Sequence, residues 1–336
     1  MVTEPVKRWT RRPEGSNWGD FGPDDQLGRL NLITPEIRKA ALAEAKDGHC
    51  FMLSLPLDYP GGYSNPMREP PRLFSRGSDG QTYYNWKWGE VVVSDDAVVM
   101  WLQYSTQWDS LAHIGVMFDV DGSGIEVPVY YNGWRAHEHI VGPNGDEPPC
   151  AHRLGIQNMA ATGVQGRGVL CDFVRAFGTA KRPVGYDDLM KVIEEQRIEV
   201  RKGDFLLFYT GVGDAVMAMN KEPDPAVYAV TGAALDGRDD RLLQWIDDSG
   251  VVALIADNGG LEYMDAETTL NPASDKFLPL HRLCLFKLGI YIGELFWLSD
   301  LAAYLRKVGR SAFLFTGPPL RLPGAVGSPV SPVATV

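Results

Sequence analysis

Short apolar runs, each ending in a polar or acidic residue, recur along the chain and restrict its fold more than any other feature. Such runs are typical of buried strands. Between them lie amphipathic segments that begin with helix-start signals, such as Thr34-Pro35-Glu36. We expect strands over residues 49–55, 97–102, 205–210, 251–257, 290–294 and 311–315, and helices that begin near residues 34, 186 and 240. Strands that alternate with helices predict an α/β fold.

Length and composition predict a globular protein with a large core. The chain has 336 residues, of which 45% are hydrophobic, and this size suits one large domain or two. We expect an extended N-terminal arm over residues 1–16 and a Pro-rich C-terminal tail over residues 317–336 that packs on the surface. Residues 56–90 are rich in proline, glycine and aromatic side chains. This composition predicts an irregular segment that covers an apolar substrate or contacts a neighbouring subunit.

Charge and cysteine spacing exclude several classes of protein. The net charge of −11 argues against nucleic acid or an anionic membrane as a partner. The chain has no apolar run near the length of about 18 residues that a membrane span requires, and its N-terminus lacks the apolar region of a signal peptide. The four cysteines are far apart and form no CxxC pair. We therefore expect a cytoplasmic protein with free thiols.

Residues 103–113, with the sequence QYSTQWDSLAH, follow the expected strand 97–102 and concentrate polar side chains at its end. In an extended strand, alternate positions point the same way, so Gln103, Gln107 and Asp109 would face one point. That arrangement is typical of a metal site. The alternative is a polar strand end followed by a helix, with Asp109 or Ser110 as its N-cap. Spacing alone does not decide between the two.

Two later residues could complete a metal site. His281 begins one apolar stretch, and Glu294 ends the expected strand 290–294. A divalent ion in a catalytic site needs about three protein ligands and an open position for water. Asp109, His281 and Glu294 would supply one imidazole and two carboxylates. Gln103 and Gln107 could add neutral oxygens.

The other histidines differ in what their positions indicate. With the proposed ligands assigned, His113 is free to act as an acid or base. His137 and His139 are two residues apart, which suits ligands on a strand as well as any polar loop. His152 has no informative spacing to that pair. The sequence leaves the roles of these last three residues open.

Six segments resemble the cyclase family of metal-dependent hydrolases, which includes bacterial kynurenine formamidase, isatin hydrolase and relatives similar to trans-dienelactone hydrolase. Residues 103–113 align with the family hallmark HxGTHxDxPxH, although glutamine stands at both leading histidine positions. The other matching segments are SNWGDFGPDDQLGRLNLITPE at 16–36, GVQGRGVLCDF at 163–173, KGDFLLFYTG at 202–211, HRLCLFKLGIYIGELFWLSDLA at 281–302 and GSPVSPVA at 327–334. Together they cover most of the chain.

The resemblance implies a role for each matching residue. Asp109 corresponds to a metal ligand, His113 to the catalytic histidine, and His281 and Glu294 to the residues that complete the site. Gln103 and Gln107 replace histidine ligands, and a carboxamide oxygen is a harder and weaker ligand than an imidazole. We therefore expect one divalent ion, manganese or zinc, with magnesium as a further candidate.

The resemblance also implies a single domain over residues 17–316, of the swivelling β/β/α type, with a mixed sheet and flanking helices, assembled as a homodimer or homotetramer. We expect a metal-dependent hydrolase in which metal-activated water attacks the carbonyl of a lactone, cyclic amide or aryl formamide. The substrate would be small and cyclic or aromatic. The alternatives are a non-catalytic small-molecule binding protein on the same fold and a metal-dependent lyase or dehydratase.

Overall fold

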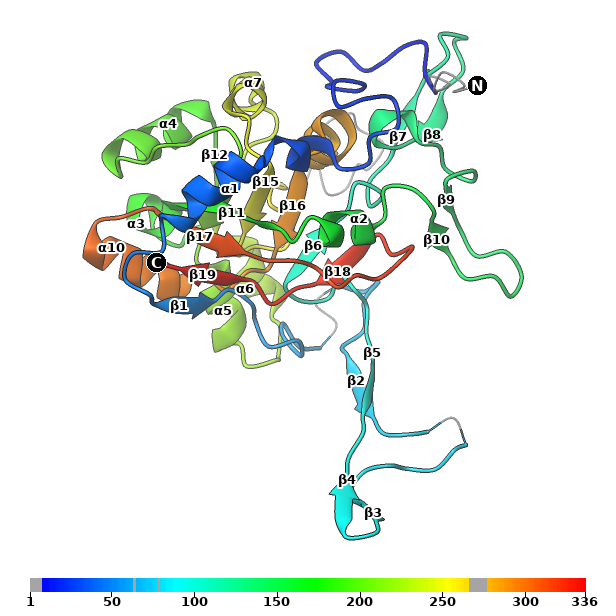
Figure 1. The fold of residues 1–336 in the computed structure, drawn as a ribbon. Helices are drawn as coiled ribbons and strands as arrows, with labels where there is room; N and C mark the ends of the chain where they lie inside the picture. Colours follow the sequence, from blue (N-terminus) through cyan, green and yellow to red (C-terminus); the bar gives the residue numbers. More distant parts are fainter. Residues whose placement is uncertain (1–7, 63–64, 78, 266–276) are drawn as a thin grey trace.

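The apolar runs of the sequence form the centre of a nine-stranded mixed sheet (Figure 1). The computed structural model describes residues 8–62, 65–77, 79–265 and 277–336. From one edge to the other, the strands are β1 (Cys50–Met52), β19 (Val333–Thr335), β17 (Ala312–Thr316), β11 (Gln165–Asp172), β13 (Phe205–Tyr209), β15 (Ala253–Ala256), β16 (Tyr291–Glu294), β6 (Gln107–Asp109) and β18 (Gly327–Pro329). Strands β11, β13, β15 and β16 are parallel, and the outer strands pair antiparallel. The predicted α/β class with a mixed sheet is confirmed.

Helices flank this sheet, and those predicted near residues 34, 186 and 240 are confirmed. The α-helices are α1 (Pro35–Leu42), α2 (Ile156–Ala161), α3 (Phe173–Phe177), α4 (Tyr186–Glu195), α5 (Val212–Ala218), α6 (Pro225–Val230), α7 (Asp240–Ser249), α9 (Pro279–His281) and α10 (Ser299–Val308). The described residues also form two 3₁₀ helices, η1 (Gly28–Leu32) and η2 (Tyr131–Gly133), and a π-helix, η3 (Arg282–Leu288). Thr34 caps α1 by accepting a hydrogen bond from the backbone N–H of Ile37 at 3.3 Å. In the described parts of the chain, every helix is too short or too polar to cross a bilayer.

Aromatic side chains fill the core beneath the centre of the sheet. Trp108 on β6 is fully buried, and its ring meets the rings of Phe296 and Phe315 edge-on at centroid distances of 5.6 and 6.1 Å. The indole N–H of Trp108 donates to the carbonyl of Gly317 at 2.8 Å, so the ring is buried without an unpaired donor. Burying one such side chain contributes about 2–3 kcal/mol. The packing of Trp108 therefore holds β6, with residues on both sides of it, against the rest of the sheet.

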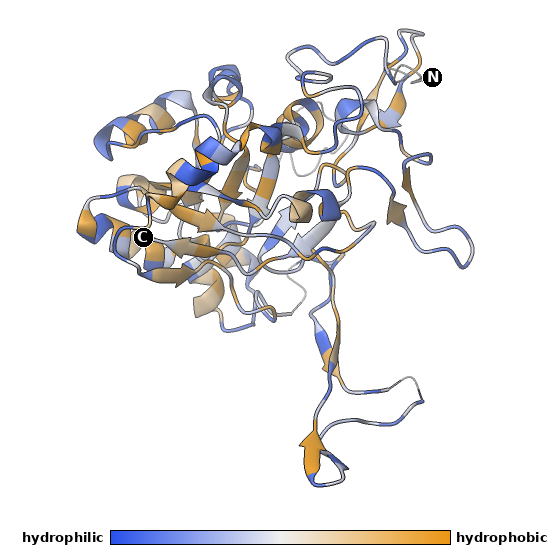
Figure 2. Ribbon diagram, viewed as in Figure 1, coloured by the Kyte–Doolittle hydropathy of each residue, from blue (hydrophilic) through white to orange (hydrophobic). Residues whose placement is uncertain are grey.

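The apolar run at residues 97–102 does not form a buried strand, which corrects that prediction. Only β5 (Ala97–Val99) is a strand, and it pairs with β2 (Arg72–Phe74) in a ribbon that projects from the body (Figure 1). β3 (Trp86–Trp88) and β4 (Val91–Val93) pair at the end of the same projection. The hydropathy of Figure 2 marks apolar residues along this projection, and the exposure of the described side chains is high at Leu73, Trp88 and Val92, which are 65–69% exposed. We call residues 72–99, apart from residue 78, the arm.

Three more two-stranded ribbons lie outside the main sheet. They are formed by β7 (Val116–Phe118) with β8 (Val127–Val129), β9 (Ile140–Val141) with β10 (Cys150–Ala151), and β12 (Arg182–Val184) with β14 (Ala233–Leu235). The first of these ribbons includes Phe118, whose ring packs against Trp18 and Phe286 of the core. The first two ribbons lie between β6 and α2 in the sequence, and the strands of the third lie after α3.

The C-terminal tail is part of the sheet, which corrects the expectation that residues 317–336 pack on the surface. β18 pairs with β6, and β19 lies between β1 and β17. Ser328, Ala334 and Val336 are fully buried. Proline is compatible with this arrangement because β18 is an edge strand. A residue there pairs on one side only, so the N–H that Pro329 lacks need not serve a second neighbouring strand. At the N-terminus, the sequence predicts an extended segment over residues 1–16. Residues 1–7 lie outside the described residues, and Trp9 is buried against Trp18.

A buried carboxylate joins the ends of two central strands. Asp257 follows β15 and accepts four hydrogen bonds of 2.6–3.2 Å, from the N–H and hydroxyl of Thr210 and the N–H groups of Gly211 and Gly213. Burial raises the pKa of Asp257 to about 6, although these hydrogen bonds oppose the shift. Asp257 thereby fixes the turn between β13 and α5 to the turn after β15.

We predict that Asp257→Ala lowers the free energy of unfolding by about 3 kcal/mol or more, because it leaves buried backbone N–H groups without acceptors. Urea unfolding followed by circular dichroism measures this change. Asp248→Ala, at an exposed carboxylate on α7, is the control and should change stability by less than about 0.5 kcal/mol. Equal effects of the two substitutions would contradict the role assigned to Asp257.

Candidate metal centre

The register of two adjacent strands places carboxylates side by side. β6 and β16 pair antiparallel, with Asp109 opposite Ile292 and Gln107 opposite Glu294. Alternate residues of a strand face the same side of a sheet, so Gln107, Asp109 and Glu294 share one face. The chain segments that supply them are nearly two hundred residues apart in the sequence, and only the sheet brings them together.

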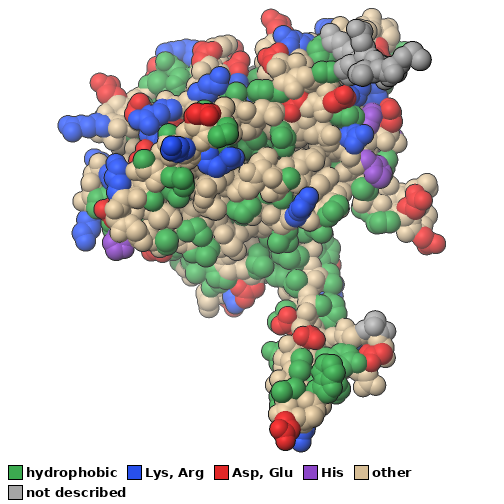
Figure 3. Space-filling model, in the orientation of Figure 1, with side chains coloured by type: hydrophobic (Ala, Val, Ile, Leu, Met, Phe, Trp, Pro, Cys, Tyr) green, Lys and Arg blue, Asp and Glu red, His purple; other side chains and the backbone are tan. Residues whose placement is uncertain are grey.

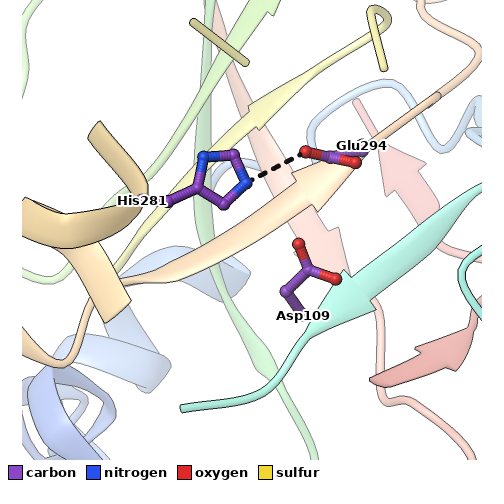
Figure 4. A group of neighbouring side chains, drawn as sticks. All are labelled: Asp109, His281 and Glu294. Atoms are coloured by element: carbon purple, nitrogen blue, oxygen red, sulfur yellow. Dashed lines mark ion pairs between the residues drawn. The ribbon is translucent and has the colours of Figure 1, made fainter. Parts of the chain in front are cut away.

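His281 faces the same point from the start of the π-helix. Its Nε2 lies 3.4 Å from Oε1 of Glu294 (Figure 4). One ligand atom from each of Asp109, His281 and Glu294 lies within 4.8 Å of the other two. All three residues are buried, with 1–6% of their surface exposed. We call these three residues the triad; the structure thus brings together the ligand set predicted from the sequence.

Glu262 holds the imidazole of His281 and was not predicted from the sequence. The Nδ1–H of His281 donates to Oε1 of Glu262 at 2.5 Å, which leaves Nε2 facing Glu294. The carboxylate of Glu262 also accepts the backbone N–H groups of Leu280 at 2.8 Å and His281 at 3.4 Å. A carboxylate on the far nitrogen is the usual support of a metal-binding histidine, because it fixes both the tautomer and the ring orientation.

Gln107 lies between the two carboxylates of the triad. Its Nε2 donates to Oε2 of Glu294 at 3.1 Å and to Oδ1 of Asp109 at 3.3 Å. Among the described residues, buried Oε1 of Gln107 and buried Oδ2 of Asp109 have no hydrogen-bond donor. Buried oxygens are rarely left unpaired, since each costs about 1–3 kcal/mol. An unpaired carboxylate oxygen on Asp109, whose ligand atoms converge with those of His281 and Glu294, suits a divalent cation, which accepts both nitrogen and oxygen ligands.

The charges of the triad depend on one another. Burial raises the pKa of Asp109, while the nearby imidazole of His113 opposes the shift. Burial alone would lower the pKa of His281, but its hydrogen bonds to Glu262 and Glu294 outweigh burial and raise that pKa to about 10. Burial would raise the pKa of Glu294, yet the hydrogen bond from His281 outweighs it and lowers that pKa. A cation at the centre would replace the proton of His281 as the partner of the carboxylates.

His113 and Gln103 lie at the edge of the triad. The Nε2 of His113 is 3.8 Å from Oδ1 of Asp109, and its side chain is 20% exposed, so solvent reaches the ring. Residues 110–113 form a turn, so the alternative of a helix capped by Asp109 or Ser110 is wrong. The carboxamide of Gln103 lies against the backbone of Gly327, the register partner of Asp109 on β18. Within the described residues, Gln103 makes no side-chain hydrogen bond to the triad.

The remaining candidate histidines lie in the loops around β9 and β10. Nδ1 of His139 accepts the backbone N–H of Arg135 at 3.2 Å, and its ring packs edge-on against Trp134. Nδ1 of His152 is 3.5 Å from the sulfur of Cys150. His137 has a left-handed backbone conformation with φ of 64°. In the described part of the chain, these three histidines form no metal-ligand cluster with the triad.

Comparison with known proteins identifies relatives across most of the chain. The Cyclase family model matches residues 51–263. A solved structure described as a novel cyclase is 31% identical, with a TM-score of 0.77, and the match covers 96% of this chain and 100% of that chain. No curated protein matches.

Isatin hydrolases have a similar fold. Isatin hydrolase A from Labrenzia aggregata, bound to benzyl benzoate, is 14% identical with a TM-score of 0.55, and the match covers 90% of this chain and 98% of that one. Isatin hydrolase A from Ralstonia solanacearum is also 14% identical, with a TM-score of 0.53 and coverage of 90% and 97%. At this level of identity, the similarity concerns the fold.

We predict that Glu262→Gln weakens the binding of a divalent ion at the triad by about 10–100-fold, because the imidazole of His281 loses its anionic partner. Competition with a chromophoric chelator measures the affinity for Mn²⁺ and Zn²⁺. Glu222→Gln, at an exposed carboxylate, is the control. Unchanged affinity in the Glu262 variant would show that this carboxylate does not support a metal ligand.

Proposed function

Because the chain belongs to the cyclase family, we propose that it is a metal-dependent hydrolase whose divalent ion is held by Asp109, His281 and Glu294. The observation that carries this proposal is the buried triad, with ligand atoms within 4.8 Å of one another. The unpaired buried Oδ2 of Asp109 supports it further, because this oxygen would gain a partner from a cation. The proposed substrate is a lactone, cyclic amide or aryl formamide.

Each side chain would have a distinct part in the reaction. When bound, the ion supplies Lewis-acid activation of water and of the substrate carbonyl. Nε2 of His113 would take a proton from water and then donate it to the leaving group. This nitrogen lies 3.8 Å from Oδ1 of Asp109, and the side chain is reached by solvent. Glu262 keeps His281 in the tautomer whose Nε2 is free to bind. Gln107 holds the carboxylates of Asp109 and Glu294 at a fixed separation.

The composition of the site favours manganese over zinc. Two carboxylates, one imidazole and a carboxamide form a set with more oxygen than nitrogen, and harder ions bind such sets well. A half-turn of the Gln107 side-chain amide would exchange its nitrogen for its oxygen and offer the ion a neutral ligand. Zinc would also fit, since it binds histidine and carboxylates in many catalytic sites.

We predict that Asp109→Asn reduces both metal content and hydrolysis, because the ligand set loses one charge. His113→Gln should keep the metal but lower kcat by about 10²–10⁴-fold, as expected for loss of a general acid–base. Elemental analysis and assays of lactones, cyclic imides and N-formyl aryl amines, with product masses, measure both effects. His137→Gln is the matched control.

Three outcomes would contradict this proposal. Full activity in His113→Gln would remove the assigned acid–base. Tight binding of these compounds without turnover, whatever divalent ion is added, would favour a binding protein. A product that has lost water, instead of gaining it, would identify a lyase or dehydratase.

We also propose that the chain forms a homodimer, or a homotetramer built from two such dimers, through the arm. Apolar side chains on the arm are 39–69% exposed, and Figure 3 shows hydrophobic side chains both along the projection and at its outer end. They are Leu73, Phe74, Tyr84, Trp86, Trp88, Val91, Val92, Val98 and Val99. Their exposed area is on the order of 1,000 Å² per chain, which exceeds the roughly 800 Å² per partner that a stable dimer buries.

A second copy suits this surface because the arm carries both signs of charge. Arg72, Arg76 and Lys87 lie among Glu90, Asp95 and Asp96. A two-fold interface places the same surface on both sides, so such a mixture can pair with itself. An apolar area of this size is uncommon on a monomer.

We predict that the wild-type protein has a mass in solution that is a multiple of twice the chain mass of 37.1 kDa, and that Trp88→Glu reduces it to the single-chain mass at micromolar concentration. Size-exclusion chromatography with light scattering measures both. Ile125→Glu is the control, because Ile125 is 69% exposed and lies outside the arm, against 67% for Trp88. A monomeric wild type would contradict the proposal, and so would a Trp88→Glu oligomer.

A further inference from the structure

A cavity of about 680 Å³ opens beside the triad, and Glu294 is part of its wall. Its other lining residues are 60, 65–68, 104, 181, 223, 225, 228–229, 259 and 295. This volume suits one small organic molecule. A second cleft, near Asp172 and Arg306, is smaller at about 260 Å³ and includes none of the triad.

Most of the cavity wall is apolar. Pro60, Pro66, Met67, Ala229 and Leu295 present hydrocarbon surface, and the rings of Tyr104 and Tyr228 add aromatic surface. Such a wall favours a ligand whose bulk is apolar, because burying that bulk removes it from water. The charged groups of the cavity then decide which polar groups the ligand can carry.

Two cationic side chains line this cavity, and they come from segments far apart in the sequence. Arg68 comes from the loop before the arm, and Lys181 precedes β12. Glu294 is the single carboxylate of the lining, and it belongs to the triad. In the described part of the chain, neither Arg68 nor Lys181 forms an ion pair with a carboxylate. A bound divalent ion would neutralise the triad and leave both cations without a counter-charge.

One hydrogen bond anchors the guanidinium of Arg68 and leaves its other N–H groups available to a ligand. Its Nη1 donates to the carbonyl of Gln103 at 2.5 Å, which anchors the guanidinium beside residues 103–113. Arg68 and Glu294 line the same cavity, so the guanidinium lies near the triad. Arginine has five N–H donors, and its planar fork matches the two oxygens of a carboxylate. The ammonium of Lys181 lies 5.7 Å from the ring centre of Tyr263 and is exposed to solvent.

We propose that Arg68, assisted by Lys181, binds a carboxylate that the substrate carries apart from its scissile bond. The substrate class is therefore a small apolar or aromatic acid, bound with its reactive carbonyl at the triad and its carboxylate at Arg68. This inference rests on the proposed function, since it takes the cavity as the substrate site. Arg68 would set specificity, because an uncharged analogue leaves its donors unpaired in a largely apolar cavity.

The test compares a neutral and an anionic probe of nearly the same shape. Benzenesulfonate and methyl phenyl sulfone share a phenyl ring and a tetrahedral sulfur, and sulfonate oxygens are too weakly basic to compete well for a metal ion. Calorimetry on the full chain loaded with Mn²⁺ gives both affinities. We expect the wild type to bind the sulfonate at least about tenfold more tightly, the range for a hydrogen bond to a charged group.

Substitutions assign this preference to particular residues. Arg68→Gln should abolish most of the preference, Arg68→Lys should retain part of it, and Lys181→Gln should reduce it a few-fold. Lys307→Gln, on the exposed face of α10, should leave it unchanged. The Arg68→Lys variant keeps the test decisive if Arg68→Gln does not fold. Equal affinity of the wild type for the two probes, or an unchanged preference in both Arg68 variants, would overturn the inference.

These measurements separate the inference from the proposed function. An anion preference that depends on Arg68, together with no hydrolysis of any lactone, cyclic imide or aryl formamide, would overturn the hydrolase proposal alone. Hydrolysis of such compounds, together with equal affinity for both probes, would overturn the carboxylate specificity alone.

Discussion

Two buried carboxylates held side by side are the constraint on which the rest of the site depends. Asp109 and Glu294 repel each other when both are ionised, and burial strengthens that repulsion because the interior screens charge poorly. The chain surrounds the pair with compensating groups. Gln107 donates to both, Nε2 of His281 lies 3.4 Å from Glu294, and Arg68 lines the cavity beside Glu294. A divalent ion would complete this balance at the point where ligand atoms already converge.

The sheet supplies the precision that this arrangement needs. β16 joins the parallel centre of the sheet to the antiparallel edge formed by β6 and β18. The register between β6 and β16 fixes which side chains share a face, and a slip of one residue would turn Asp109 to the opposite side. Trp108, between Gln107 and Asp109, faces the core and holds that register through its packing. The fold and the site therefore depend on the same three residues of β6.

Part of this site could be predicted from the sequence, and the physical reasons for success and failure differ by residue. Asp109, His281 and Glu294 lie in segments that match family motifs, and the structure brings them together. Glu262 and Arg68 carry no local signal, because each acquires its role only through contacts with distant residues. Residues 97–102 have the composition of a buried strand, but residues 97–99 pair within the projecting arm. The Pro-rich tail resembles a surface segment, yet Pro329 lies in an edge strand of the main sheet.

Diffraction from crystals grown with Mn²⁺, recorded where manganese scatters anomalously, would test the central claim most directly. We predict one anomalous peak within coordination distance of Nε2 of His281 and of a carboxylate oxygen of both Asp109 and Glu294. We also predict that Nδ1 of His281 stays bound to Glu262. A fully ordered triad with no peak, or a peak bound by other side chains, would contradict the assignment of this site as the metal centre.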